Sequence, residues 1–164
     1  MFKILKLSDD KTDLHFDCES LQLSIVNGLR RTILNDITNI GFGYEPKRTI
    51  KILKNTTANH DEYLCHRLCM VPVNIEEWYS NPGNVDIEDY TFYLKTNCNS
   101  QQKKNGGYVT TDDFIVKKKV NDDIVELNTL DCFPKSFKFK SPILITRYPN
   151  RDGADQELEL ECKL

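Results

Sequence analysis

The sequence predicts a protein of mixed helices and short strands, in which one amphipathic helix is followed by a β-rich segment. Apolar residues between Ser20 and Ile37 recur three and four positions apart, which is typical of one face of an α-helix. Residues before this helix alternate between apolar and polar, as strands do. The segment from Trp78 to about Pro142 contains turn signals and short apolar runs, so we expect a small, mostly β insertion there.

The helix from Ser20 to Ile37 is the element around which we expect the chain to be organised. Ser20 suits the N-cap position, because its hydroxyl can accept a hydrogen bond from a first-turn amide. Gly28 lies in the middle, where glycine costs roughly 0.5–1 kcal/mol relative to alanine, so we expect another helix to cross close to its backbone. The apolar stripe is broad, and it consists of Leu21, Ile25, Val26, Leu29, Ile33, Leu34 and Ile37.

Two interpretations of this helix remain open from its pattern. It is either an amphipathic core helix whose Arg30 and Arg31 are simply solvated, or a helix that packs partly on its own domain and partly on another subunit. The second interpretation requires that the folded chain leave apolar side chains of the helix uncovered.

The other elements are short. Phe2 to Leu7 and Leu14 to Asp17 predict a hairpin, and Asn59 to Met70 predicts a second helix that Asn59 and Glu62 would begin as a capping box. In the last strand, apolar and charged residues alternate, so we expect an edge strand with one solvated face. The strands expected after the first helix are Arg48–Leu53, Tyr90–Leu94, Tyr108–Val116, Ile124–Leu127, Phe137–Phe139, Ile143–Thr146 and Glu157–Leu164.

Length and charge restrict the function classes. The 164 residues suffice for one core, or for a core domain with one insertion. A formal net charge of −3 provides no electrostatic footprint for independent nucleic-acid binding, and the basic run Lys117 to Lys119 predicts only a weak local contact.

No apolar run approaches the ~20 residues of a membrane span, so we expect an intracellular, soluble protein without membrane contact. The Asn-, Lys- and Ile-rich composition hints at a virus or a protist.

The side chains do not predict catalysis or a cofactor. The six cysteines are too dispersed for a disulfide framework or a paired zinc site, so we expect reduced thiols. Cys65 and Cys69 share a helix face, but His66 points away from it, so we predict no metal. The residues from His60 to Glu62 are expected to cap and orient the second helix.

Several motifs resemble those of one family. The first helix reads NGLRRTIL from Asn27, and the sequence continues with NTT at Asn55, HDEYL at His60, HRL at His66 and VPV at Val71. These motifs resemble those of the α-like assembly subunits of multisubunit RNA polymerases, which are the bacterial α amino-terminal domain, its archaeal counterpart and the third-largest subunit of eukaryotic RNA polymerase II. Two later stretches are similar to the same family, namely YVTTDDF from 108 and PILI from 142 with its return strand QELELE from 156.

The sequence also departs from that family. Gly28 stands where the family often has alanine, Thr38 replaces a usual proline, and Cys69 replaces a usual glycine. The insertion lacks the clustered cysteines that bind metal in some relatives. Family members continue into a long C-terminal helix that completes the dimer, whereas this sequence stops at Leu164. We therefore expect either a trimmed chain or a divergent subunit whose missing part another chain supplies.

The resemblance implies an α+β fold with two parts. Residues 1–77 and 143–164 would form a discontinuous dimerisation domain, and residues 78–142 an inserted β-rich domain. The implied role is structural and non-catalytic: the chain pairs with a smaller α-like subunit, and the pair becomes the platform for the two large catalytic subunits and for small assembly subunits. We expect this role in the nucleus, or in the cytoplasm or virion if the protein is viral.

The expected binding residues lie on both helices. We assign the heterodimer contact to Leu21, Ile25, Val26, Leu29 and Ile33. The resemblance implies contacts to a large subunit for Arg30, Arg31 and Arg67, and arginine is favoured where planar, bidentate pairing is needed. Two alternatives remain open: a free-standing β-rich protein-binding module, which would be monodisperse alone, and a metal- or thiol-dependent enzyme, which would need Cys65 and Cys69.

Overall fold

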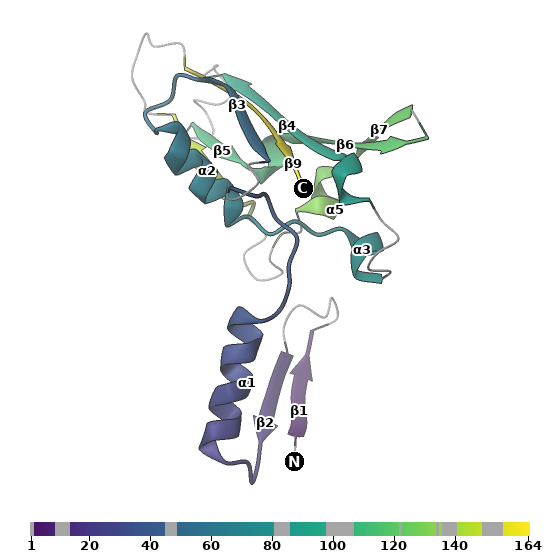
Figure 1. The fold of residues 1–164 in the computed structure, drawn as a ribbon. Coiled ribbons are helices and arrows are strands. Elements are labelled where there is room, and N and C mark those ends of the chain that lie inside the picture. The colour runs from purple at the N-terminus through teal and green to yellow at the C-terminus, as the bar shows by residue number, and fades with distance from the viewer. Residues whose placement is uncertain are drawn as a thin grey trace. The chain divides into compact units, whose positions relative to one another are not determined.

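The computed structural model describes residues 2–8, 14–44, 49–80, 86–97, 107–121, 123–133, 135, 141–148 and 156–164. The chain divides into two compact units. Unit 1 comprises Met1–Asn39 with Ser136–Lys140, and unit 2 comprises Ile40–Lys135 with Ser141–Leu164. The described elements are mostly strands with a few helices (Figure 1), so the predicted α+β class is confirmed.

Unit 1 consists of a hairpin and one helix. Strands β1 (Phe2–Leu7) and β2 (Leu14–Cys18) pair antiparallel, and α1 spans Leu23–Asn35. The predicted hairpin and first helix are therefore confirmed. The N-cap prediction was wrong: Gln22 is the N-cap and makes no side-chain cap bond, whereas Ser20 adopts a positive φ of 63° in the turn before the helix.

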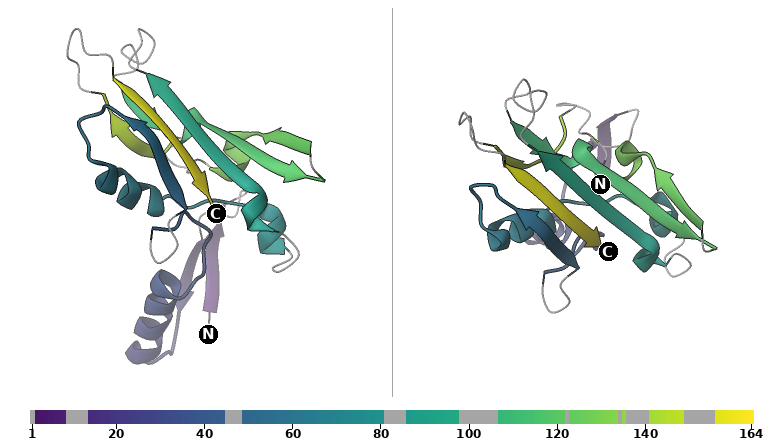
Figure 2. Two further views of the ribbon diagram at one scale, coloured as in Figure 1. Left: turned by 45° about the horizontal axis from the view of Figure 1, so that its top comes forward. Right: turned by 90° about the horizontal axis from the view of Figure 1, so that it is seen from above.

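Unit 2 contains a five-stranded antiparallel sheet in the order β3-β9-β4-β6-β7 (Figures 1 and 2). The expectation of an edge strand at the end of the sequence was wrong, because β9 lies between β3 and β4. The sheet joins strands from the predicted dimerisation segments to strands from the predicted insertion, and those domain assignments remain predictions. The strands are β3 (Ile50–Asn55), β4 (Tyr90–Asn97), β6 (Phe114–Val120), β7 (Asp123–Leu127) and β9 (Glu157–Lys163).

One face of this sheet forms the core of unit 2. In β9, Leu158, Leu160 and Cys162 are fully buried, while the charged residues between them face the other side, as predicted. Phe92 of β4 packs against Phe42 with ring centroids 5.2 Å apart in an edge-to-face arrangement, a favoured geometry for aromatic pairs. Helix α2 (Asp61–Cys69) adds its buried residues Leu64, Cys65 and Leu68 to the same core, which confirms the second predicted helix.

The remaining elements are short. The predicted strand Tyr108–Val116 is interrupted, because Thr110 and Asp113 form a capping box that begins the single-turn helix η2 between β5 and β6. Helices α3 and α5 were not predicted from the sequence, and the expected strand Phe137–Phe139 lies outside the described residues. These elements are α3 (Glu76–Ser80), η1 (Ile87–Asp89), β5 (Tyr108–Thr110), η2 (Thr111–Asp113), α5 (Thr129–Cys132) and β8 (Leu144–Arg147), which pairs with β5. None of the described helices is long and apolar enough to cross a membrane.

Candidate assembly interface

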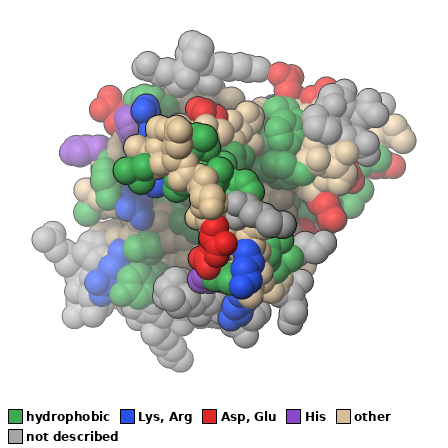
Figure 3. All heavy atoms as spheres, turned by 90° about the horizontal axis from the view of Figure 1, so that it is seen from below, with side chains coloured by type: hydrophobic (Ala, Val, Ile, Leu, Met, Phe, Trp, Pro, Cys, Tyr) green, Lys and Arg blue, Asp and Glu red, His purple; other side chains and the backbone are tan. Residues whose placement is uncertain are grey.

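Among the described residues of unit 1, the first helix leaves much of its apolar stripe exposed, with Val26 and Leu29 half-buried. None of the residues of α1 is buried. Leu23 is 84% exposed and Ile25 is 54% exposed, although leucine and isoleucine are among the residues most often fully buried in folded proteins. Apolar side chains, green in Figure 3, also reach the molecular surface on the side seen from below. Within the described part of unit 1, the helix thus has the exposed apolar surface that the interface interpretation requires.

The hairpin presents an apolar face of its own. The register pairs Phe2 with Cys18, Ile4 with Phe16, and Leu7 with Leu14, so these six residues share one face of the hairpin. A register shift between Ile4 and Lys6 keeps this alignment. The rings of Phe2 and Phe16 contact each other with centroids 5.9 Å apart, yet all six side chains remain at least partly exposed.

A groove of about 540 Å³ lies between β2 and α1 within unit 1. Phe16 lines it from the hairpin, and Val26, Leu29, Ile33 and Leu34 line it from the helix, with Arg30 beside them. Four of the predicted partner-binding residues therefore lie together, namely Val26, Leu29, Arg30 and Ile33. Sequence reasoning missed Phe16, Asp17 and Cys18, although the alternation of the predicted strand could have shown that Phe16 and Cys18 share a face.

The other residues assigned to α1, which are Leu21, Ile25 and Arg31, are not among those that line this groove. Leu21 lies just before the helix and is half-buried, and Arg31 is exposed. Arg30 donates from Nε and from Nη2 to Oδ1 of Asn27, at 3.2 and 3.1 Å. A Cβ placed on Gly28 would meet no atom within 4 Å, so the helix expected to cross there is not found among the described residues of this chain.

Arg67 belongs to unit 2 and contacts its own chain. Its Nη2 donates to the backbone oxygen of Leu144 over 2.6 Å, and its Nη1 donates to the hydroxyl of Tyr63 over 3.3 Å. Its Nε is buried and has no hydrogen-bond partner among the described residues. The guanidinium therefore ties α2 to β8, whatever it contacts outside the chain.

The NTT motif at Asn55 and the residues after it form a network of hydrogen bonds in unit 2. Asn55 accepts from the backbone amide of Thr57 and donates to the backbone oxygen of Asn59 and to Asp61, at 2.9, 2.8 and 2.7 Å. Asn59 in turn donates to the buried hydroxyl of Thr146. The predicted capping box was wrong, because the N-cap of α2 is His60 and it makes no side-chain cap bond.

The buried thiols are poor candidates for chemistry. Burial raises the pKa of Cys132 to about 11, and burial, followed by the nearby thiol of Cys65, raises the pKa of Cys69. Burial also raises the pKa of Cys162. These thiols are therefore protonated at neutral pH, and the thiol form is not the nucleophile or the metal ligand. Among the described residues, no three His, Cys, Asp or Glu side chains are grouped to hold a metal ion.

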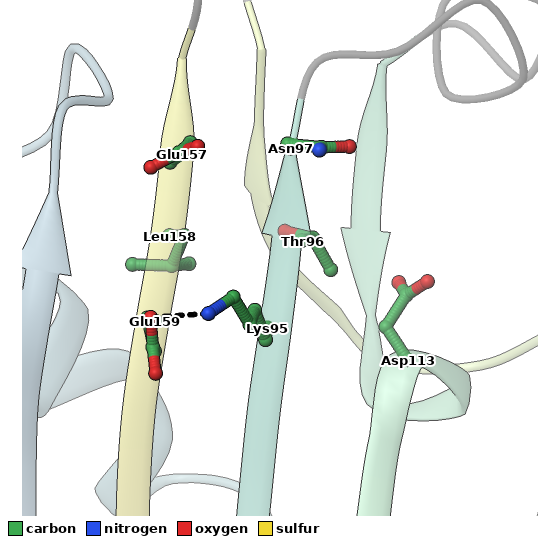
Figure 4. Close-up of a pocket in the computed structure, with 7 residues that line it drawn as sticks. All are labelled: Lys95, Thr96, Asn97, Asp113, Glu157, Leu158 and Glu159. Atoms are coloured by element: carbon green, nitrogen blue, oxygen red, sulfur yellow. Dashed lines mark ion pairs between the residues drawn. The ribbon is translucent and has the colours of Figure 1, made fainter.

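Two ion pairs join neighbouring strands on the outer face of the five-stranded sheet, Lys54 with Glu157 and Lys95 with Glu159. Figure 4 shows a pocket of about 370 Å³ at one end of this sheet, where the Nζ of Lys95 on β4 lies 3.0 Å from a carboxylate oxygen of Glu159 on β9. Tyr93 donates a hydrogen bond to the same carboxylate. The Tyr93 bond first, and then the Lys95 bond, lower the pKa of Glu159. These groups neutralise one another across strands, an arrangement that stabilises a sheet and does not poise a catalytic acid.

Comparison with known proteins finds relatives among RNA polymerase subunits. The chain is 28% identical over 115 residues to DNA-directed RNA polymerase subunit Rpo3 of Pyrococcus horikoshii, covering 70% of this chain and 42% of that protein. It is 30% identical over 103 residues to DNA-directed RNA polymerases I and III subunit rpac1 of Dictyostelium discoideum, covering 59% and 28%. It is also 29% identical over 86 residues to a conjugation stage-specific protein of Tetrahymena thermophila, covering 52% and 23%.

These matches cover only part of each relative. The chain spans about a quarter to two-fifths of the length of the curated relatives it matches first. No family model matches the sequence. The resemblance expected from the motifs is nevertheless confirmed: the chain is a homologue, at 24–30% identity, of the Rpo3 and RPAC1 subunits of DNA-directed RNA polymerases, which are α-like assembly subunits.

Proposed function

We propose that the chain is a non-catalytic assembly subunit of a DNA-directed RNA polymerase. In this role it heterodimerises with a smaller α-like subunit, and the pair forms the platform on which the two large catalytic subunits assemble. The observation that carries the proposal is that none of the residues of α1 is buried, although the helix has a broad apolar stripe. An exposed apolar stripe of this kind supports a contact with another protein.

The heterodimer contact is proposed for the apolar surface of unit 1. Val26, Leu29 and Ile33 would receive partner side chains in the groove beside Phe16. Leu21 and Ile25 would extend the contact along the helix. An apolar partner surface would remove these side chains from water, which contributes about 25 cal/mol per Å² of apolar area buried.

The arginines are proposed as contacts to a large subunit. Arg30 holds its guanidinium through Asn27 at the helix surface, where a carboxylate of another chain could pair with it. Arg31 is exposed on the same helix. For Arg67 the intrachain bonds to Leu144 and Tyr63 support a positioning role for α2 together with any contact outside the chain.

The proposed role includes its setting. The chain would work inside the cell, in the nucleus of a eukaryote or in the cytoplasm or virion of a virus, with small assembly subunits as further neighbours. The acidic charge balance supports little direct contact with nucleic acid. The large subunits, and not this chain, would carry out the chemistry.

Native mass spectrometry of what co-purifies with the tagged full chain tests this proposal. We expect a one-to-one complex with a smaller α-like subunit and, at low salt, a larger assembly that contains both catalytic subunits. A tagged chain that elutes as a monodisperse monomer without these subunits would refute the proposal and would favour a free-standing β-rich binding module.

A further inference from the structure

We infer that unit 1 is an incomplete core, which becomes stably folded only when a partner covers it, so that folding of the hairpin and α1 is coupled to assembly. The partner's identity rests on the proposed function. The instability of the uncovered unit does not, because it follows from the contacts within this chain.

The hairpin of unit 1 has too little support to be stable alone. None of the described residues of unit 1 is buried. A two-stranded hairpin in water is marginal at best, and it needs further strands or a well-packed helix to persist. Here α1 stands beside β2 across a groove of about 540 Å³, so the helix does not close over Phe16. Among the described residues of unit 1, none therefore provides the cover that would hold the apolar face of the hairpin.

Helix α1 also lacks the local features that stabilise an isolated helix. It has 13 residues, a length at which helices are marginal in water unless packing supports them. Its N-cap makes no side-chain bond, its first turn contains no acidic residue, and its last turn contains no basic one. Gly28 and the β-branched Ile25, Val26, Thr32 and Ile33 lower its helix propensity further.

Helix α2 of the same chain provides the internal comparison. It is shorter, but Asp61 and Glu62 lie in its first turn and His66 and Arg67 in its last, which suits the helix dipole at both ends. Leu64 and Leu68 are fully buried in the core of unit 2. Unit 2 thus has a packed core that holds its helix, whereas the described part of unit 1 has none.

Stability is therefore distributed unevenly along the chain. Regions with few buried apolar contacts open locally at low free-energy cost, while core strands open only with the whole domain. A partner that fills the groove beside Leu29 and Ile33 supplies the missing apolar contacts, and the ordering of unit 1 then accompanies binding. An unassembled subunit would consequently differ from an assembled one in the backbone of residues 2–39.

Amide hydrogen exchange of the full chain, followed by mass spectrometry, tests the inference. At a concentration where light scattering shows a monomer, peptides that cover β1, β2 and α1 should exchange fully at the first time point, while peptides that cover β4 and β9 stay protected. After the co-purified smaller α-like subunit is added, the α1 peptides should become protected as well. Protection of α1 in the monomer equal to that of β4 and β9 would overturn the inference.

A propensity variant makes the test independent of the partner. Gly28→Ala meets no neighbouring atom, so it should raise the helical population of α1 in the monomer by up to about fivefold, measured from Cα chemical shifts. Gly41→Ala in unit 2 is the matched control and should leave α1 unchanged. A Gly28→Ala variant with unaltered shifts, because α1 is already fully helical, would contradict the inference. Neither result depends on co-purification, so the failure of the inference and that of the proposed function are separable.

Discussion

The side-chain amide of Asn59 donates to the hydroxyl of Thr146 over 2.7 Å and joins the start of α2 to strand β8 across 87 positions of sequence. Thr146 is buried, so its hydroxyl depends on this bond. The polar turn before α2 thus contributes to the fold of unit 2.

Removing either partner of this bond should destabilise the chain. We expect Asn59→Ala to lower the free energy of unfolding by about 1–3 kcal/mol, because a buried hydroxyl is left without its donor. Thr146→Val should cost less, and the double variant should be less destabilised than the sum of the two. Urea unfolding of the four proteins measures this coupling, and strictly additive effects would contradict a direct bond.

The bonds of Arg67 within its own chain predict an effect on the stability of the isolated chain, in the absence of any partner. Arg67→Met keeps an apolar stem of similar reach to the arginine methylenes but removes the bonds to Leu144 and Tyr63, so we expect a loss of about 1–3 kcal/mol in the unfolding free energy of the isolated chain. Arg31→Met, at an exposed position of α1, should change it by no more than about 0.5 kcal/mol. Equal stability of wild type and Arg67→Met in chemical denaturation would show that the guanidinium does not hold α2.

The carboxylate of Glu159 gives a pH dependence with a defined sign. The hydrogen bonds from Tyr93 and Lys95 lower its pKa in the folded chain. The stability that they contribute is therefore present above the unfolded-state pKa and is lost as the pH falls through the folded-state pKa. Glu159→Gln should flatten the dependence of the urea midpoint on pH between about 5 and 3, and Tyr93→Phe should flatten it in part. A wild-type slope in Glu159→Gln would be inconsistent with this account.

Cys18 reports on whether the groove of unit 1 is covered. It lines the groove and is half-buried, whereas Cys65 and Cys162 are fully buried. In the isolated chain iodoacetamide should modify Cys18 well before these two thiols. When the smaller α-like subunit saturates the chain, the reaction of Cys18 should slow roughly tenfold or more. At lower concentrations of the subunit, the slowing should follow the fraction of chain that is bound. An unchanged rate in the complex, read by peptide mass mapping, would mean that the partner binds elsewhere.

Some features of the fold were predictable because local residues determine them. The alternation of Leu158, Leu160 and Cys162 with charged residues predicted the two faces of β9, and the three-and-four spacing predicted α1 and α2. The place of β9 inside the sheet was not predictable, because pairing with β3 and β4 depends on contacts distant in sequence. The predicted N-cap residues were also wrong, because Ser20 and Asn59 each lie before the residue that caps the helix.

The candidate interface was predictable only in part. The helix pattern identified Val26, Leu29 and Ile33, but their apolar face could equally have been covered by the chain itself. Only the structure shows that the described residues leave it open, and only the register of the hairpin places Phe16 and Cys18 on the same face. Arg67 was chosen on residue type, and its bonds to its own chain could not be read from spacing.

The most direct test of the central claim is co-purification of charge variants on the two faces of α1. Ile25→Asp and Leu29→Asp place a carboxylate on the apolar face, and Ile25 is largely exposed, so that variant spares the contacts of unit 1 itself. Ser24→Asp introduces the same charge at an exposed position off the apolar stripe.

The quantity to measure is the amount of the smaller α-like subunit that each tagged chain retains under native conditions. The account predicts that Ile25→Asp and Leu29→Asp weaken binding about a hundredfold or more, equivalent to roughly 3 kcal/mol. Ser24→Asp should bind at least as tightly as wild type, because an acidic residue in the first turn stabilises α1. Retention of the partner by both apolar-face variants at the wild-type level would contradict the claim that a second polypeptide covers this helix.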